Sequence, residues 1–201
     1  MKRISLDAES RAPNFIGAWS MDSSGLCDDL IDYFENNQSK QTTGTTSGGV
    51  NLEVKDTSDV TVLPKEIKLP GNAAFESYFQ FLHVCYQDYL EQWPFFASIA
   101  NNLEVGSFNI QRYGPGQHFQ KVHTERDGIG SLHRILAWMT YLNDVDECSG
   151  GGTYFDHYEL NVQPRQGKTL IWPAEWTHAH RGSVLKSGSK YVITGWIHFT
   201  K

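Results

Sequence analysis

From about residue 101 onward the chain is a succession of short runs in which apolar and polar residues alternate. This pattern limits the possible folds more than any other feature of the sequence. The runs are SFNIQRY, HRILAWMTYLN, GGTYF, LNVQP, KTLIWP and KYVITGWIHF. They are rich in β-branched and aromatic residues, and Gly, Pro, Asn or Asp separates them, so we predict short strands. Many short strands at this spacing are typical of a β-sandwich or barrel, a class that includes jelly rolls and cupins.

The first half of the chain has a different pattern. Residues 23–37 and 72–93 space their apolar residues for one buried helix face, so we predict two helices there. Asn72 is a candidate N-cap of the second helix, and Pro94 lies just beyond its expected end. Between the helices, residues 36–50 are rich in Thr, Gly and Ser, which predicts a loop or mobile segment.

The chain length favours one domain. Its 201 residues suffice for a single hydrophobic core, and the composition of 39% hydrophobic residues is globular rather than disordered. We therefore predict one α+β domain over residues 1–201. In it, a helical part with a mobile loop (residues 1–100) packs on a barrel formed by residues 101–201 approximately.

The charge and the cysteine content limit which binding partners and which cellular compartment are expected. The net charge is −6 and no run of Lys or Arg is present, so nucleic acid is not an expected partner. No stretch approaches the roughly 18 apolar residues of a membrane span, and no apolar leader follows the first basic residues. The three cysteines are far apart and odd in number, which favours a reducing compartment. We expect a cytoplasmic protein; the sequence indicates no oligomeric state.

Two short stretches suggest a metal site. In VHTERD, an extended backbone would direct His123 and Glu125 to the same side. Two histidines and one carboxylate on one face of an octahedron are the non-haem Fe(II) oxygenase pattern. The stretch THAH offers His178 and His180 as the third ligand. The pair His123 and Glu125 alone is a weak signal, because such pairs also occur on solvated surfaces.

The residues after THAH suggest a cation near this site. Counting from His180, Gly188 lies at +8 and Lys190 at +10; counting from His178, the lysine lies at +12. The SGS stretch is a plausible turn, so the two flanking runs are expected to pair as a hairpin. Such pairing would bring Lys190 near the metal, where it suits the far carboxylate of a metal-chelated dicarboxylic acid.

These motifs together resemble the 2-oxoglutarate/Fe(II)-dependent dioxygenases, specifically their prolyl 4-hydroxylase-like branch. The family pattern is H-x-D/E, followed later by a histidine with Lys or Arg at about +10. RYGPGQHFQKVH, RILAWMTYLND, GGGTYF and KYVITGWI resemble further family motifs in the same order. The resemblance covers roughly residues 105 to 199, and the first hundred residues carry no comparable motif.

The resemblance implies a double-stranded β-helix, a jelly-roll barrel, with specific residues at its site. The implied iron ligands are His123, Glu125 and His180, and Lys190 with Tyr113 would hold the C5 carboxylate of 2-oxoglutarate. Most family members have Asp where this chain has Glu125, so the reach of this ligand differs by one methylene. Asp127 is an alternative ligand, although its position on the strand is poorer.

Several more residues are candidates for the pocket. Asn109 and Gln111 share a strand face with Tyr113, and packing is an equal alternative for both. His178 is expected beside the ligands, and Trp196 as a residue that closes the barrel floor. Arg134 is expected as a structural ion-pair partner, with a substrate contact as the alternative.

By resemblance, the expected activity is hydroxylation of a prolyl residue in a peptide or protein, with release of succinate and CO2. Fe(II) is the implied metal, 2-oxoglutarate the cosubstrate and ascorbate the reductant. The alternatives are hydroxylation of a free amino acid or another small metabolite, and a non-catalytic cupin-like metal-binding protein. Lys190 counts against the cupin, and Glu125 counts against a halogenase of the same fold, which lacks this carboxylate.

Overall fold

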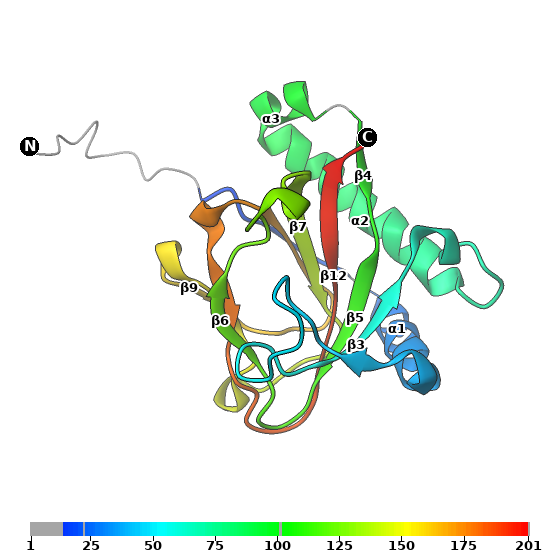
Figure 1. The fold of residues 1–201 in the computed structure, drawn as a ribbon. Coiled ribbons are helices and arrows are strands. Elements are labelled where there is room, and N and C mark those ends of the chain that lie inside the picture. Colours follow the sequence, from blue (N-terminus) through cyan, green and yellow to red (C-terminus); the bar gives the residue numbers. More distant parts are fainter. Residues whose placement is uncertain (1–13, 22, 101, 201) are drawn as a thin grey trace, which may run out of the picture.

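Two antiparallel β-sheets form the framework of the computed structural model, which describes residues 14–21, 23–100 and 102–200 (Figure 1). Residues 1–13, on which the expectation of no apolar leader rested, therefore lie outside the described part. The strands are β1 (Gly17–Ser20), β2 (Thr42–Thr43), β3 (Ser58–Val62), β4 (Leu103–Val105), β5 (Phe108–Tyr113), β6 (Phe119–His123), β7 (Arg134–Tyr141), β8 (Thr153–Phe155), β9 (Leu160–Val162), β10 (Lys168–Pro173), β11 (His180–Gly182) and β12 (Lys190–Phe199). The larger sheet has the order β1-β10-β7-β12-β5-β3-β2, with β4 also paired to β12, and the smaller sheet has the order β6-β11-β8-β9.

Helices cover the outer face of the larger sheet. The helices are α1 (Ser24–Asn36), α2 (Ala73–Gln92) and α3 (Pro94–Ile99), with short 3-10 helices η1 (Gln38–Lys40), η2 (Pro64–Glu66), η3 (Ile129–Ser131), η4 (Glu147–Ser149), η5 (Asp156–Tyr158) and η6 (Trp176–His178). In Figure 1, α2 runs behind β12 and β5, whereas β6 and β9 of the smaller sheet lie on the other side of the molecule. The side chain of Asn72 does not cap α2; it donates to the carbonyl of Glu66. Pro94 opens α3, where its missing N–H costs nothing.

Strand β7 shows how the alternating sequence builds two separate cores. Leu136 and Trp138 belong to the core between the larger sheet and the helices. The residues between and after them, Ala137, Met139 and Tyr141, belong to the core between the two sheets. Successive side chains of a strand point to opposite faces, so the same period-two run supplies both cores. This arrangement confirms the predicted jelly roll with helices packed on it.

The helical face is held by large buried side chains. Phe34 of α1 and Phe75 and Tyr78 of α2 are buried in the core on the outer face of the larger sheet. Complete burial of an aromatic or large aliphatic side chain contributes about 1.5–3 kcal/mol. Tyr78 also shares a hydrogen bond of 2.8 Å with the hydroxyl of Thr140, so its polar end is satisfied inside the core. These contacts fix α1 and α2 against the sheet.

The expectation of a helical first half is wrong in part. Strands β1, β2 and β3 all come from residues before 101, and all three join the larger sheet. The segment 36–50 contains η1, β2 and a bridge between Thr46 and Gly49. The physical reason is visible in β3, where Val60 and Val62 alternate with polar neighbours and are completely buried. A five-residue strand gives a much shorter periodic signal than a helix of 20 residues.

The expected hairpin between THAH and the last strand is also wrong. β11 pairs with β6 and β8 in the smaller sheet, whereas β12 pairs with β5, β7 and β4 in the larger sheet. Both edges of β11 are therefore already occupied, and residues 183–189 cross from one sheet to the other. Among the described helices, none is both long and apolar enough to cross a membrane.

Candidate active site

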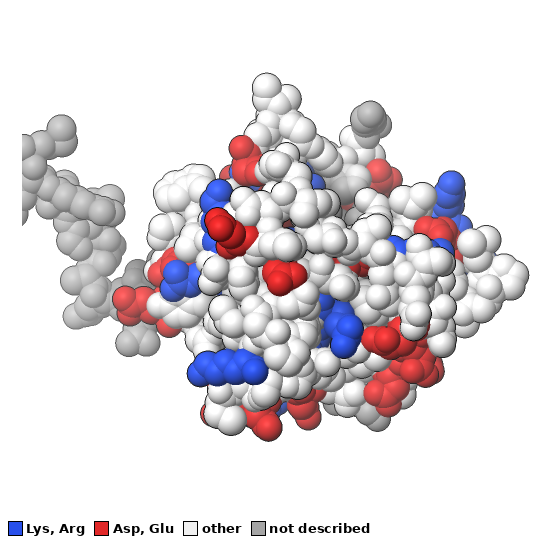
Figure 2. Space-filling model, turned by 60° about the horizontal axis from the view of Figure 1, so that its bottom comes forward, with Lys and Arg blue, Asp and Glu red and all other residues white. Residues whose placement is uncertain are grey.

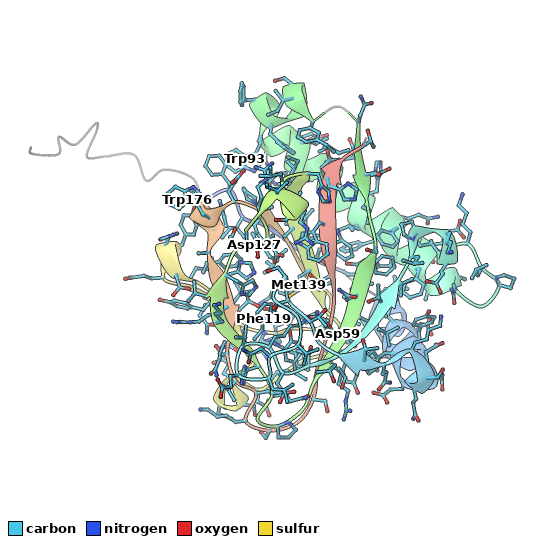
Figure 3. All side chains as sticks on the ribbon, viewed as in Figure 1. Asp59, Trp93, Phe119, Asp127, Met139 and Trp176 are labelled. Atoms are coloured by element: carbon cyan, nitrogen blue, oxygen red, sulfur yellow. The ribbon has the colours of Figure 1, made fainter. Side chains whose placement is uncertain are left out.

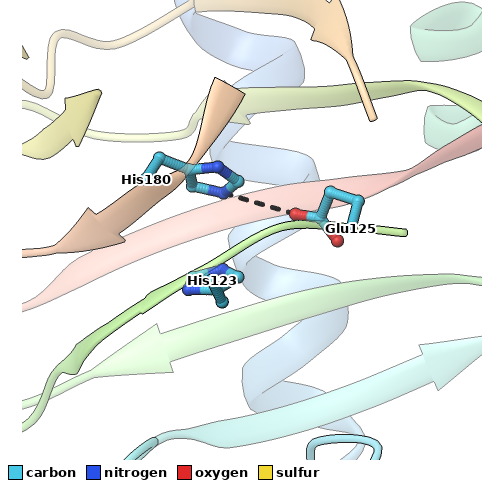
Figure 4. A group of neighbouring side chains, drawn as sticks. All are labelled: His123, Glu125 and His180. Atoms are coloured by element: carbon cyan, nitrogen blue, oxygen red, sulfur yellow. Dashed lines mark ion pairs between the residues drawn. The ribbon is translucent and has the colours of Figure 1, made fainter. Parts of the chain in front are cut away.

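His123, Glu125 and His180 meet at the open side of the barrel (Figure 4). His123 ends β6 and His180 begins β11, and the two residues are register partners across these strands. Glu125 follows two residues after His123, and its Oε1 lies 3.3 Å from Nε2 of His180. Candidate ligand atoms of the three residues all lie within 4.8 Å of one another. The sequence placed His123 and Glu125 on one face, and the structure brings His180 beside them.

The backbone fixes the orientation of both imidazole rings. Nδ1 of His123 lies 2.8 Å from the carbonyl oxygen of Lys121, and Nδ1 of His180 lies 2.9 Å from that of His178. A carbonyl only accepts, so each Nδ1 must carry the proton and each Nε2 keeps its lone pair. Histidine ligands of metals are usually held in this way. Ligand bonds of about 2.1 Å at a right angle put neighbouring donor atoms about 3 Å apart, so this donor set fits a divalent metal ion.

The protonation states also suit a metal. Burial lowers the pKa of His123 to about 4, and the neighbouring His180 acts in the same direction, so the ring is neutral at pH 7. Burial by itself raises the pKa of the Glu125 carboxyl. The neighbouring rings of His180 and His123 and the indole N–H of Trp196 outweigh burial and lower the pKa to about 2. Neutral imidazoles and an ionised carboxylate are the forms that bind a metal.

His178 is not the pocket residue that we expected. It ends the 3-10 helix η6 rather than lying on an extended strand, so the pleat argument does not apply. Its buried ring points elsewhere, with Nε2 2.7 Å from the carbonyl oxygen of Asn14. Only the backbone carbonyl of His178 reaches the site, through the Nδ1 of His180. Asp127 is also not grouped with the ligands; its carboxylate accepts from Ser47 and Ser131.

A pocket of about 810 Å³ opens beside the three ligands, between the two sheets. Figure 3 shows Asp127, Met139, Phe119 and Asp59 around this space. Of the residues expected from the sequence, Asn109, Gln111, Tyr113, Arg134, Lys190 and Trp196 all line it. The ring of Phe119 stacks on that of His123 with centroids 3.7 Å apart, and this packing further restricts the imidazole.

Lys190 is a buried cation in this pocket. It is the register partner of Tyr113, and its Nζ lies 3.8 Å above the centroid of that ring. Its Nζ donates to the carbonyl oxygen of Gly151 at 3.0 Å. The described residues place no carboxylate in ion-pair contact with Nζ, and burial lowers the pKa of Lys190 to about 7. An anionic ligand in the pocket would supply the missing charge.

A buried polar network continues from Tyr113, and the sequence analysis missed two of its members. The Tyr113 hydroxyl donates to Oε1 of Gln111 at 3.0 Å, and Nε2 of Gln111 donates to Asp59 at 3.2 Å. Asp59 also forms a buried ion pair with Lys55, at 2.6 Å. The four-residue spacing of Lys55 and Asp59 in KDTSD (55–59) was the available signal, because it puts both side chains on one face of an extended segment. Asn109 lies at the edge, where it accepts from Thr61.

Two loops meet at the mouth of the pocket. Ser47, from the segment before β3, donates to the carboxylate of Asp127 at 2.6 Å, which joins segments 80 residues apart. Arg126 pairs with Glu175 and donates to the carbonyl of Leu132, which ties the second loop down. Basic and acidic residues are interspersed on the face shown in Figure 2, so no broad basic surface is seen there.

Comparisons with known proteins agree with this geometry. Residues 108–198 match the 2OG-Fe(II) oxygenase superfamily. The chain is 29% identical over 136 residues to a probable prolyl 4-hydroxylase 9 of Arabidopsis thaliana, a match that covers 55% of this chain and 46% of the relative. It is 24% identical over 99 residues to a PKHD-type hydroxylase of Crocosphaera subtropica, covering 47% of this chain and 43% of the relative. The chain thus spans less than half the length of these curated relatives.

Solved structures show the same fold at low sequence identity. A Pseudomonas putida prolyl-4-hydroxylase superimposes with a TM-score of 0.69 at 14% identity, covering 94% of both chains. A Trichoplax adhaerens prolyl hydroxylase, in complex with a peptide fragment of the hypoxia inducible factor oxygen degradation domain, gives 0.70 at 13% identity, covering 92% of this chain and 84% of that one. The barrel residues 108–198 are thus similar to the 2OG-Fe(II) oxygenase superfamily, and the fold is the one seen in the solved prolyl hydroxylases.

Proposed function

We propose that this chain is an Fe(II)- and 2-oxoglutarate-dependent dioxygenase that hydroxylates a prolyl residue in a peptide or protein. One observation carries the proposal: the donors of His123, Glu125 and His180 and the buried cation of Lys190 line the same pocket. A metal held on one face by three protein donors keeps three positions for other ligands. Bound Fe(II) would supply the redox chemistry that couples conversion of 2-oxoglutarate to succinate and CO2 with hydroxylation of the substrate.

The protein residues have distinct proposed tasks. His123, Glu125 and His180 would hold the iron through Nε2, Oε1 and Nε2. Lys190 would bind the C5 carboxylate of 2-oxoglutarate, and the charge-assisted contact is strong because Lys190 is only 3% exposed. Tyr113 would turn its hydroxyl from Gln111 to this carboxylate. Met139 and other apolar groups of the pocket wall would exclude water.

The mouth of the pocket supports a peptide substrate. Residues 42–48 contribute to the lining, and the hydrogen bond between Ser47 and Asp127 joins them to the opposite loop. A segment in this position would serve as a lid over an extended chain. The Trichoplax structure contains a peptide, which favours a peptide for this chain as well. The alternatives remain a free amino acid or small metabolite, and a metal-binding cupin without catalysis.

Two accompanying proposals concern the reductant and the compartment. Ascorbate would maintain the iron as Fe(II), as the family resemblance implies. The described cysteines, Cys27, Cys85 and Cys148, are all free thiols. Free thiols are typical of a reducing compartment, which supports a cytoplasmic location.

The test is a turnover assay with Fe(II), 2-oxoglutarate and ascorbate. The substrates are proline-containing peptides, free proline and other free amino acids. We expect succinate release together with a mass gain of about 16 Da, one oxygen atom, on a prolyl residue. The His180→Ala variant should release no succinate. A mass gain only on a free amino acid would overturn the peptidyl proposal, and metal binding without any turnover would favour the cupin.

Shortening the segment 44–49 tests the lid separately. A lid is needed for peptide hydroxylation but not for slow turnover of 2-oxoglutarate without substrate, so only the first activity should be lost. If neither activity changes, the segment is a passive surface loop.

A further inference from the structure

The carboxylate of Glu125 has two oxygen atoms, and the fold directs them to different partners. Oε1 lies 3.3 Å from Nε2 of His180, on the side where the three donors converge. Oε2 accepts a hydrogen bond of 2.7 Å from the indole N–H of Trp196. The two residues are 71 positions apart in the chain, so the larger sheet has to bring this indole to the site.

The indole is itself held in place. Trp196 lies on the central strand β12, opposite Ala137 of β7, so its backbone is fixed within the sheet. The guanidinium of Arg134 lies 3.7 Å from the centroid of its ring, close enough for a strong cation–π contact. Arg134 also donates from Nη1 to the backbone carbonyl of Glu125 at 2.9 Å. Arg134 therefore touches both the backbone of Glu125 and the residue that holds the end of its side chain.

We infer that Trp196 and Arg134 are positioning residues that hold the Glu125 carboxylate with Oε1 turned toward the metal site. This inference rests on the proposed function. A glutamate that follows the end of a strand can turn about one more bond than an aspartate, so an unheld Glu125 carboxylate would have to be ordered when the metal binds. The hydrogen bond from Trp196 occupies Oε2. Oε1 is then already turned toward the metal site, so less side-chain freedom is lost when the metal binds.

The longer side chain is part of this arrangement. An aspartate at position 125 would withdraw the carboxylate by about one carbon–carbon bond, about 1.5 Å. It could then not reach both the metal and an indole that the sheet and Arg134 hold in place. The contact of Trp196 should therefore matter for the glutamate and not for an aspartate. This dependence separates a positioning role from general packing. If Trp196 acted only through packing, its substitution would weaken metal binding equally with glutamate and with aspartate at position 125.

A double-mutant cycle on metal binding tests the inference. The four proteins are the wild type, Trp196→Phe, Glu125→Asp and the double variant, each titrated with Co(II) without cosubstrate. We expect Trp196→Phe to weaken metal binding about 10- to 100-fold in the wild-type background. In the Glu125→Asp background the same change should alter the affinity by no more than about twofold. Equal losses in both backgrounds, or no loss in the wild type, would overturn the inference.

Trp172→Phe is the matched control. Trp172 lines the same pocket, its ring lies 5.2 Å from that of His180, and its Nε1 has no hydrogen-bond partner among the described residues. We expect its metal affinity to stay within about twofold of the wild type. A loss as large as that of Trp196→Phe would assign the effect to lost ring packing and overturn the inference.

A second variant covers the case that Trp196→Phe does not fold. Arg134→Lys keeps the positive charge but loses the planar stack on the indole of Trp196. It should therefore weaken Co(II) binding when position 125 is glutamate and not when it is aspartate. A wild-type protein that binds no Co(II) would refute the proposed function itself. A wild-type protein that binds it without coupling between positions 125 and 196 would refute only this inference.

Discussion

The affinity for 2-oxoglutarate should fall as the pH rises above about 7, because binding needs the charged form of Lys190. This side chain is 3% exposed and donates to a neutral carbonyl, that of Gly151, at 3.0 Å. Burial lowers its pKa from 10.5 to about 7. About half of the lysines are thus protonated at pH 7 in the empty pocket, and fewer are protonated at higher pH.

The sign and the size of the effect follow from linkage. A bound C5 carboxylate favours the ammonium form and raises the pKa of Lys190, so binding above pH 7 takes up a proton. Each pH unit above the pKa of the empty pocket then weakens the apparent affinity tenfold, which is about 1.4 kcal/mol. From about pH 7, where half of the lysines are charged, to about pH 9 the affinity should fall about 50-fold, which is about 2.3 kcal/mol. Below about pH 6 the lysine is already charged, and the affinity should become constant.

Calorimetric titration of the anaerobic Fe(II) protein with 2-oxoglutarate measures this effect. Buffers with different heats of ionisation report the proton uptake, which should rise from about half a proton at pH 7 to nearly one above pH 8. The control is Lys190→Arg, because a guanidinium stays charged throughout this range and should give a flat profile. A flat profile for the wild type, or the same slope for the arginine variant, would refute the reasoning.

Three further changes test other parts of the structure. His180→Ala should lose bound iron whereas His178→Ala should keep it, since only the backbone carbonyl of residue 178 contacts the site. The iron content of both purified proteins tests this, and the opposite result would exchange the roles of the two histidines. Lys55→Met should lower the free energy of unfolding by about 3–5 kcal/mol in urea, because it leaves the buried Asp59 carboxylate without its counter-ion. The double change Lys55→Met/Asp59→Leu should cost much less, and equal losses would show that packing rather than charge is responsible. Gly195→Ala should lower the free energy of unfolding by about 1–3 kcal/mol in the same assay, because the new Cβ would lie 2.7 Å from an indole carbon of β7. An unchanged urea midpoint would mean that the sheet adjusts freely to the extra methyl group.

The parts of the fold that the sequence predicted well are strands with two buried faces. The predicted runs KTLIWP and KYVITGWIHF coincide with β10 and β12. Both strands lie inside the larger sheet, with neighbours on either edge. Large apolar residues of these strands point alternately into the two cores, which gives a long period-two pattern in the sequence. By contrast, β1 and β2 at the ends of this sheet have only four and two residues, too few for a pattern.

The spacing between His180 and Lys190 predicted a lysine near the metal donors. The structure agrees with this position, but the backbone geometry that was predicted to produce it is wrong. A hairpin was expected, but the residues between them cross from the smaller sheet to the larger one. The crossing is anchored by Leu185, which is completely buried and whose N–H donates to the carbonyl of Gln117 at 3.0 Å. Sequence spacing encodes the length of a connection but not the sheet in which its end is placed. Both routes put the lysine beside the pocket, so the spacing alone could not distinguish them.

The two halves of the chain contribute different ends of the pocket, and this division explains what the motifs could not predict. His123, Glu125, His180 and Lys190 all come from the part that resembles the family, and they determine the proposed metal and cosubstrate. The opposite wall and the mouth include residues 42–61, which carry no motif and reach the pocket only because β3 pairs with β5. A substrate of the proposed activity would have to pass this wall to reach the metal site. We therefore expect changes in residues 42–61 to alter which substrate is accepted, and changes in the barrel motifs to alter whether any reaction occurs.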